Sequence, residues 1–461
     1  MTLRTRKALF YGLVAIFLVV GGGVALYAQG WRFDFGTFQP SKVGAIYIRS
    51  YPGDAQIFIN GKLTPNKSGF LSPGTFISDL FPKNYTVALK EKGYDSWSEV
   101  APVAPAMVVQ MKYAVLVPDT ATSVATSVSA VQNFFESGGN IITTKATASS
   151  SASSSASSSA SSSTGSAILW RGKKIATGAV ISHSTNLKNF IYRSALGNDV
   201  LYDLTEATTT NLTPIMKSIG ATTKNITSIA IDPYDETRVI VQTPQNISAI
   251  DLSNNNNAID IADAPRGQVL QPPLAISSSL FAWTQFSTAS NTSQIVIYDK
   301  FSGNITDNSL VIPGAIKELK WINGGTLGIV RADGTLYRYN VGAEQFTKIA
   351  DDVRDFYPTA DGNELAALEN QSLEVFSFTT SDYYRFALPD IAAVTSLAWY
   401  KDGTHLFVNY PDRVDFLDLE DAALHNFTVI SQSSASFYDA SENALYVVDQ
   451  GRKLIRFDFP S

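Results

Sequence analysis

The feature that most constrains this chain is a block of three short hydrophobic runs, separated by turn residues, that recurs along most of its length. The clearest copy is VTSLAWYKDGTHLFVNYPDRVDFLD, residues 394–418. Its three runs of β-branched and aromatic residues are Thr395–Tyr400, His405–Asn409 and Arg413–Leu417. Asp402-Gly403 joins the first two runs and Pro411-Asp412 joins the last two, and both dipeptides favour tight turns. The block therefore predicts a small antiparallel meander.

A single meander cannot bury both of its faces, so it needs copies of itself packed alongside. The third runs of successive copies end at Arg171, Asp203, Asp251, Asp299, Asn340, Ser377, Asp418 and Asp458. A spacing near forty residues, with three or four strands per copy, is typical of a β-propeller. We expect an all-β chain with a propeller of eight blades over residues 113–461, or of seven if residues 114–145 lie outside the ring. A β-sandwich is the competing architecture, and eight even repeats disfavour it.

Two segments resemble known propeller repeats. WYKDGTHLFV at 399–408 resembles the W-x-x-D-G element of TolB-like and WD40-like propellers, and ADGTLYRYNVGAEQF at 332–346 resembles a quinoprotein-type repeat. These resemblances imply the propeller architecture and do not select a subfamily.

A Ser- and Ala-rich tract at 146–166 has too little apolar surface to fold, which predicts disorder. NFFESGGNIIT at 133–143 matches the template hairpin, and the third run ILWR follows the tract. The tract is therefore predicted to be an insertion between the second and third strands of the first blade. Because the last copy stops at Phe459, we expect Ala114–Val117 to supply the missing outer strand and close the ring.

The N-terminus has the pattern of a membrane anchor. A basic tail at 1–7 precedes an uncharged apolar run at 8–31, which is long enough to cross a membrane as a helix. A signal peptide cleaved after Ala28 is the alternative, but the apolar run is longer than usual and Leu26 occupies a position that normally holds a small residue. With Arg4 and Lys7 before the helix, the positive-inside rule predicts a cytoplasmic N-terminus and an extracytoplasmic 32–461.

Residues 42–112 show a different β pattern, with runs at Gly44–Ser50, Ala55–Asn60, Tyr85–Leu89 and Met107–Met111. SYPGDAQIFINGK at 50–62, followed by YTVALKEKGYDSW at 85–97, resembles a PEGA domain. The positions that match the family's pattern are Ser50, Pro52, Gly53, Ala55, Asn60, Gly61, Gly93 and Tyr94. The chain departs from it at Pro82-Lys83-Asn84, where the family has Pro-Gly, and in a long linker at 63–78. The resemblance implies a small β-sandwich that acts as a spacer or binding module and transfers no active-site residues.

Composition excludes several classes of function. The net charge of −6, with only 16% charged residues, makes nucleic acid an unsuitable partner. There is no cysteine, and the three histidines, at 183, 405 and 425, lack metal-ligand spacing. No nucleophile elbow, phosphate loop or dinucleotide motif occurs. We therefore assign no catalytic, cofactor-binding or metal-binding residue and expect no cofactor.

The aspartates that end many third runs have two interpretations, a calcium or acidic site and ordinary turn capping. Their recurrence once per copy favours capping of backbone N–H groups. The many aromatic residues also have two interpretations, a stacking platform for glycans or peptides at the propeller mouth and, for most of them, ordinary sheet packing. The function expected is that of a single-pass envelope protein that binds proteins or surface glycans without catalysis. The alternative is a propeller hydrolase, lyase or quinoprotein whose site is assembled from loops at the central channel, which converging carboxylates would indicate.

Overall fold

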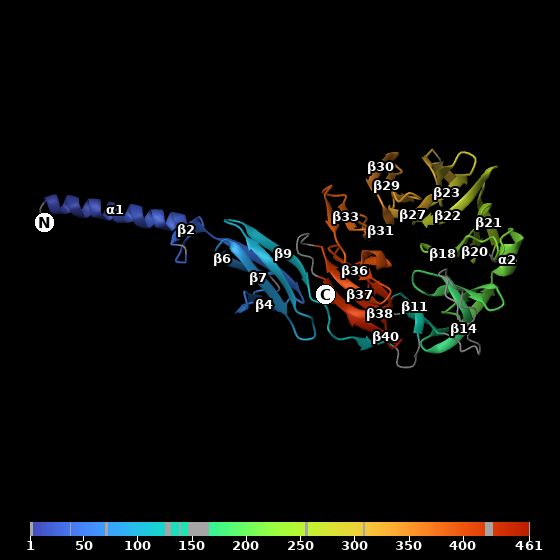
Figure 1. Cartoon of the computed structure of the whole chain (residues 1–461), viewed down its shortest axis with the longest axis horizontal. Coiled ribbons are helices and arrows are strands. Elements are labelled where there is room, and N and C mark those ends of the chain that lie inside the picture. Colours follow the sequence, from blue (N-terminus) through green and yellow to red (C-terminus); the bar gives the residue numbers. More distant parts are fainter. Residues whose placement is uncertain are drawn as a thin grey trace. The chain divides into compact units, whose positions relative to one another are not determined.

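A computed structural model shows an almost entirely β protein with one long N-terminal helix (Figure 1). It describes residues 3–36, 38–69, 72–124, 131–137, 140–145, 166–253, 257–307, 309–419 and 427–460. His425 and all but the last residue of the 146–166 tract lie outside this set, so the prediction of disorder there stays a prediction.

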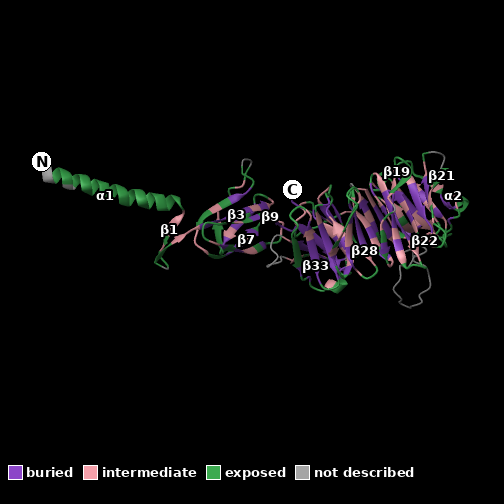
Figure 2. Ribbon diagram, turned by 90° about the horizontal axis from the view of Figure 1, so that it is seen from above, coloured by how far each residue is buried: buried purple, intermediate pink, exposed green. Residues whose placement is uncertain are grey.

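The N-terminal helix, α1, spans Leu3–Ala28 and is exposed along its length (Figure 2). It is long and apolar enough over Thr5–Ala28 to cross a membrane or to serve as a signal sequence. It begins and ends earlier than the predicted 8–31. Gly30 has a positive φ of 81° and donates its N–H to the carbonyl of Tyr27, a glycine stop that ends the helix before Trp31.

A hairpin that the sequence did not predict follows the helix. Its strands are β1 (Trp31–Asp34) and β2 (Gln39–Lys42), and Trp31 pairs with Lys42 at the open end.

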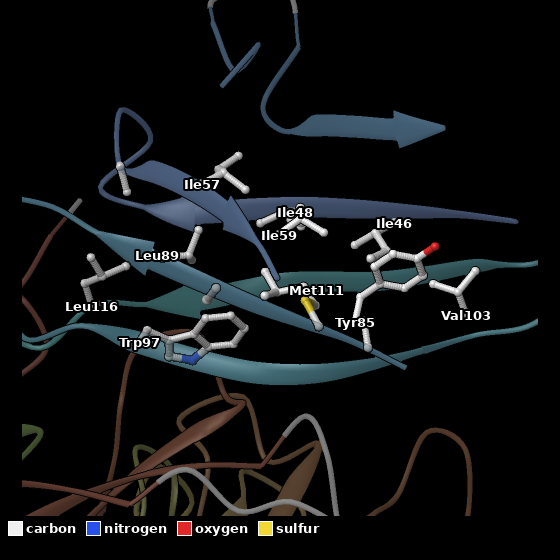
Figure 3. Close-up of a cluster of buried hydrophobic side chains, with 14 residues drawn as sticks. Ile46, Ile48, Ile57, Ile59, Tyr85, Leu89, Trp97, Val103, Met111 and Leu116 are labelled. Carbon is white, nitrogen blue, oxygen red and sulfur yellow. The ribbon is translucent and has the colours of Figure 1, made fainter. Parts of the chain in front are cut away.

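The next part of the chain is a small sandwich of two sheets. The three-stranded sheet has the order β6 (Thr75–Leu80), β3 (Gly44–Tyr51) and β9 (Val108–Val115). The four-stranded sheet has the order β5 (Lys62–Thr64), β4 (Gln56–Ile59), β7 (Lys83–Lys90) and β8 (Trp97–Val103). Inward side chains of both sheets, such as Ile46, Met111, Leu89 and Trp97, form one buried core between them (Figure 3).

The predicted Asn60-Gly61 hairpin joins β4 to β5, with positive φ at both residues and Ile59 opposite Lys62. Two predictions for this region are wrong. The linker at 63–78 contains the start of β6, which pairs with β3. Ala114 and Val115 belong to β9, where they pair with Ser50 and Tyr51, and both side chains are buried.

The remainder is a β-propeller, built from sheets that follow one another around a ring (Figure 1). One seven-stranded sheet has the order β11 (Val131–Ser137), β12 (Asn140–Lys145), β13 (Ala167–Trp170), β14 (Lys173–His183), β15 (Asn189–Ser194), β16 (Asp199–Asp203) and β17 (Thr208–Asn211). A short helix, α2 (Thr213–Ser218), follows it.

Four smaller sheets come next along the chain. Their strands are β18 (Ser228–Asp232), β19 (Asp235–Gln242), β20 (Asn246–Asp251), β21 (Asn257–Asp263); β22 (Gln268–Ile276), β23 (Leu280–Ser287), β24 (Thr292–Asp299), β25 (Asn304–Asp307), β26 (Val311–Pro313); β27 (Ile316–Asn323), β28 (Thr326–Arg331), β29 (Leu336–Asn340), β30 (Gln345–Ala350); and β31 (Val353–Pro358), β32 (Glu364–Glu369), β33 (Leu373–Ser377), β34 (Tyr383–Phe386). The last sheet has seven strands, in the order β10 (Thr122–Ser123), β40 (Leu454–Asp458), β39 (Ala444–Asp449), β38 (Phe427–Asp439), β37 (Arg413–Asp418), β36 (His405–Asn409) and β35 (Ser396–Trp399).

Each seven-stranded sheet contains one unusually long strand. In β14, residues up to Thr177 pair with β13, and residues from Gly178 pair with β15. Divided at β14 and β38, the described strands form eight consecutive groups of four strands, with β26 as a fifth strand in the fourth group. The count of eight blades stays a prediction, because strand pairing does not by itself count the blades around one axis.

The ring closes through a strand from the far N-terminal side, as predicted, but the strand is a different one. Thr122 and Ser123 of β10 pair with Arg456 and Ile455 of β40. A buried cluster then joins the first group to the last, with Phe134 of β11 against Tyr446 and Val448 of β39. Closure in this way leaves β40 without an open edge.

Neighbouring groups are held by similar clusters of buried side chains, and much of each propeller strand is coloured as buried in Figure 2. Ile240 and Trp283 belong to one such cluster between the third and fourth groups, and Val330 and Phe356 to one between the fifth and sixth. The tract at 146–165 connects β12 to β13, which are themselves paired with Lys145 opposite Ala167. The strands therefore have the arrangement that an insertion within the first group requires.

Candidate functional site

Many of the propeller's acidic side chains lie at one end of the strands. In an antiparallel group of four, the turn after the first strand and the turn after the third lie at the same end, which we call the first-turn end. Asp203, Asp251 and Asp299 lie there, and each accepts backbone N–H groups of its own turn at 2.7–3.0 Å. The pKa of Asp299 is lowered chiefly by the hydrogen bond from the Ser302 N–H. For these three residues, the predicted capping role is confirmed.

Three carboxylates from the two extremes of the propeller sequence come together at the first-turn end. Glu136 is near the end of β11, Asp439 ends β38, and Glu442 lies in the turn that follows. One oxygen of each carboxylate lies within 4.8 Å of the others, and Glu136 and Asp439 are buried. We call these residues the carboxylate cluster.

Two side chains of the last group bind one member of the carboxylate cluster. Arg456 donates from Nη1 to Oε2 of Glu442 at 2.7 Å, and the Tyr446 hydroxyl donates to the same oxygen at 2.6 Å. Burial raises the pKa of Tyr446, and the Glu442 hydrogen bond and the charge of Glu136 add to this. Tyr446 is therefore a neutral donor at physiological pH.

The carboxylate cluster has the oxygen donors that a hard divalent cation such as Ca²⁺ or Mn²⁺ prefers. Its carboxylates also have the chemistry of general acids and bases. Arg456 competes with a cation for Glu442, while Ser441 donates both its N–H and its hydroxyl to Asp439, at 2.7 and 2.6 Å. Sequence analysis missed this site because Glu136 is some three hundred residues from Asp439 and Glu442, and only ring closure brings them together.

A second polar contact at the first-turn end joins the third and fourth groups. Lys300 Nζ lies 2.5 Å from Oδ2 of Asp232, and the two side chains are only 5% and 0% exposed. Lys300 also donates to the carbonyl of Ser277 at 3.1 Å and lies 4.9 Å from the centre of the Phe281 ring. Both charges are thus removed from water, and each has a partner.

Two exposed aromatic residues flank this buried ion pair. Phe301 follows Lys300 in the chain and is 84% exposed, and Tyr234 lies two residues after Asp232 and is 61% exposed. Lys300 Nζ lies 5.6 Å from the centre of the Tyr234 ring. We call Tyr234 and Phe301 the aromatic pair, and the ion pair beneath links the two turns that bear them.

The opposite end of the propeller contains a polar hollow of about 590 Å³, lined by residues of the fifth and sixth groups. Glu369 and Glu374 are both buried beside it, and Arg385 donates from Nε to Oε1 of Glu374 at 2.6 Å. Burial raises the pKa of Glu369; the hydroxyl of Ser372 opposes this shift and the charge of Glu374 adds to it.

The described histidines have local partners. His405 is buried, and its Nδ1 lies 2.8 Å from Oδ2 of Asp402, in the predicted Asp402-Gly403 turn. His183 Nδ1 lies 3.0 Å from the Ser184 carbonyl, and its ring packs on Phe135. The carboxylate cluster includes neither of them.

Comparison with known proteins finds no matching family model and no matching curated protein. Among solved structures, the chain is similar to an oligogalacturonate lyase in complex with manganese, at 10% identity and a TM-score of 0.44, over 59% of this chain and 86% of that one. An oligogalacturonate lyase from Vibrio parahaemolyticus gives 10% and 0.44, over 61% and 89%. A chain of the mitotic checkpoint complex gives 13% and 0.42, over 61% and 87%. At these levels of similarity the propeller assignment rests on the strand pairing, and no activity is transferred. The PEGA resemblance stays a prediction.

Proposed function

We propose that this chain is a membrane-anchored, extracytoplasmic binding protein that presents the first-turn end of its propeller to a protein or glycan of the cell envelope, with no catalysis of its own. The aromatic pair is the observation that carries the proposal. In this arrangement the N-terminal sandwich, which resembles a PEGA domain, is a spacer or a second binding module.

The aromatic pair has the properties of a binding hot spot. Tyr234 and Phe301 offer large flat surfaces that stack on sugars or pack into pockets of a partner. Asp232 and Lys300 fix the two turns from below, so little conformational entropy is lost when a partner binds. A rigid scaffold that carries contact residues on its loops is the usual design of such sites.

Binding is tested by comparing three forms of the detergent-solubilised full chain, each immobilised and exposed to envelope extract and to a glycan array. They are the unchanged chain, the Tyr234→Ser/Phe301→Ser variant, and a control, Leu196→Ser. Leu196 is also highly exposed, at 88%, but lies in the turn between β15 and β16 at the opposite end. We expect a ligand that the unchanged chain and the control retain and the aromatic variant loses. Equal retention by all three forms would contradict the role of the aromatic pair.

The proposed topology places α1 in the membrane, with Arg4, Arg6 and Lys7 in the cytoplasm. The chain has no cysteine, so single-cysteine variants test it directly. A Ser290→Cys variant, in an exposed propeller turn, is expected to react with a membrane-impermeant maleimide on intact cells, and a Lys7→Cys variant only after permeabilisation. The reverse pattern would invert the topology. Loss of an N-terminal epitope from the mature chain would show that α1 is a cleaved signal.

The carboxylate cluster favours a second candidate function, a hydrolase or lyase that uses these acids directly or through a divalent cation. The test is turnover of a polysaccharide panel by the full chain, with added Mn²⁺ or Ca²⁺ and with EDTA. Activity that is lost in Glu442→Gln and kept in the control Glu374→Gln, from the opposite end, would establish this function and displace the first proposal. Absence of turnover across the panel would favour binding.

A further inference from the structure

The hairpin β1–β2 bears three phenylalanine side chains that the rest of the described chain leaves uncovered. Phe33, Phe35 and Phe38 are 48%, 78% and 76% exposed. The ring of Phe33 lies 5.2 Å from that of Phe35 and 6.4 Å from that of Phe38, measured between ring centres, and both contacts are edge-on. The three rings, which we call the phenylalanine cluster, therefore form one apolar surface at the tip of the hairpin.

An exposed cluster of this kind costs free energy in water. Burial of a phenylalanine side chain is favourable, so three rings gathered at one exposed tip indicate a surface that is covered in use. The question is what covers it.

The hairpin is tied directly to the end of α1. Val43, next to β2, donates its N–H to the Gly30 carbonyl at 2.9 Å, and Arg32 of β1 donates from Nη1 to the Tyr27 carbonyl at 2.8 Å. Phe33 is only five positions after Ala28 in the chain, a reach of at most about 18 Å. The phenylalanine cluster is thus held close to the end of the apolar helix.

The length of α1 determines how far its C-terminal end extends beyond the hydrocarbon core of a membrane. The 24 residues of Thr5–Ala28 extend roughly 36 Å as a helix, about 6 Å more than the hydrocarbon core. The last turn of α1 therefore reaches the headgroup region. The hairpin begins at Trp31, three positions after the end of α1, and therefore starts at the level of the lipid headgroups.

The residues around the base of the hairpin are those that concentrate at membrane interfaces, namely Tyr, Trp, Arg and Lys. The guanidinium carbon of Arg32 lies 3.6 Å from the centre of the Tyr27 ring, and Lys42 Nζ lies 5.6 Å from that of Trp31. Arg32 also forms an ion pair with Asp79 of β6, at 2.7 Å. The cations thus have fixed positions beside the aromatic rings, which suits a boundary between lipid and water.

From these observations we propose that the β1–β2 hairpin is a membrane-interface anchor. The phenylalanine cluster inserts among the acyl chains of the leaflet in which α1 ends, while Arg32 and Lys42 remain at the lipid headgroups. The inference rests on the proposed retention of α1 as a membrane helix. Its consequence is that the hairpin restricts how the sandwich that follows it moves on the membrane surface.

The test uses the full chain in phosphatidylcholine vesicles, with a fluorophore on a single cysteine at Phe38→Cys and, as a second position, Phe35→Cys. Both side chains are largely exposed, so their replacement leaves the fold intact. In vesicles without a quencher, the emission at either position is expected to shift to shorter wavelength. Lipids that carry a quencher near the headgroup are expected to remove most of this emission. The matched control is Leu196→Cys, at an exposed propeller turn, which is expected to keep water-like emission.

A fluorophore at Leu18→Cys separates the two proposals. Quenching at 18 by deeply placed quenchers, without quenching at 35 or 38, would overturn the interface anchor and leave the membrane helix standing. No quenching at 18 would overturn both. Shielding of position 38 in detergent without lipid, increasing with protein concentration, would show that a second copy of the chain covers the cluster and would likewise overturn the inference.

Discussion

The Asp232–Lys300 pair and the carboxylate cluster both lie at the first-turn end of the propeller, yet they balance charge differently. In the first, one buried carboxylate has one buried ammonium 2.5 Å away. In the second, three carboxylates meet, and Arg456 binds one of them at 2.7 Å. The first site also joins groups that are adjacent in the chain, whereas the second joins the first group to the last.

The contrast shows what distinguishes a structural ion pair from a site with capacity for a ligand. A balanced buried pair is satisfied by itself and contributes mainly to the specificity of packing. A cluster with more acids than bases is where perturbed groups and functional sites are usually found. Substitutions that change the balance at each site test this distinction.

The largest effect is expected from breaking the buried pair with Lys300→Met. It leaves Asp232 as an uncompensated buried charge, so we expect the free energy of unfolding to fall by roughly 3–5 kcal/mol in denaturant titrations. The control is Lys348→Met, whose ion pair with Asp351 is exposed and contributes little to stability. The double variant Asp232→Asn/Lys300→Met should recover most of the loss. Equal effects of the two lysine substitutions would show that the buried Asp232–Lys300 pair matters no more for stability than an exposed ion pair.

A smaller loss is expected from Arg456→Met, which removes the side chain that donates to Glu442 of the carboxylate cluster. Charged hydrogen bonds of this kind are worth about 1.5–3 kcal/mol. Urea titrations of the full chain measure this. If Glu442→Gln/Arg456→Met is no more stable than Arg456→Met, charge balance is not what the arginine provides.

The glutamates of the opposite hollow give a test through pH. Burial raises the pKa of Glu369, which means that the folded chain favours the protonated side chain. The contribution of Glu369 to stability is therefore fully present below the ordinary pKa of glutamate and is lost as pH rises through the raised value. Glu369→Gln should therefore stabilise the chain at pH 7 and have little effect near pH 4. Glu374→Gln should destabilise it at pH 7, because Arg385 binds Glu374 directly. Thermal unfolding of both variants across this range decides the sign.

The smallest effect on stability is expected from Phe301→Ala. Its side chain is exposed, so the free energy of unfolding should change by less than about 0.5 kcal/mol even where ligand binding is lost. The control is Phe281→Ala. The Phe281 ring lies against Lys300 and is buried, so its loss should lower the free energy of unfolding by roughly 3–5 kcal/mol. A large destabilisation by Phe301→Ala would mean that the ring supports the fold and is not a contact residue.

Local patterns predicted much of the fold correctly. The third runs of all eight copies are strands, from β13 to β40, and the Asp402-Gly403 and Asn60-Gly61 turns are hairpins. These features depend on residues a few positions apart, such as alternating apolar side chains and a glycine with positive φ. The role of Asp299 as a turn cap belongs to the same class, since its partners are the next residues of the chain.

What failed were predictions that depend on where a segment finds its partner. Ala114–Val117 and Thr122–Ser123 both have enough β propensity to close the ring, and only the sandwich core decides that Ala114 and Val115 belong to β9. The phenylalanine cluster was missed for a related reason: an apolar residue near a turn is ordinarily buried by the fold, and only the structure shows that these rings are not.

The sequence by itself determined the all-β class, the repeat, and the apolar helix, because periodicity, turn chemistry and hydrophobic length are written in adjacent residues. Tertiary structure alone decided the carboxylate cluster and the Asp232–Lys300 pair. Asp232 and Lys300 are far apart in the chain, as is Glu136 from the other two acids of the cluster, and the distances between them are set by how neighbouring sheets pack and by the closure of the ring through β10 and β40.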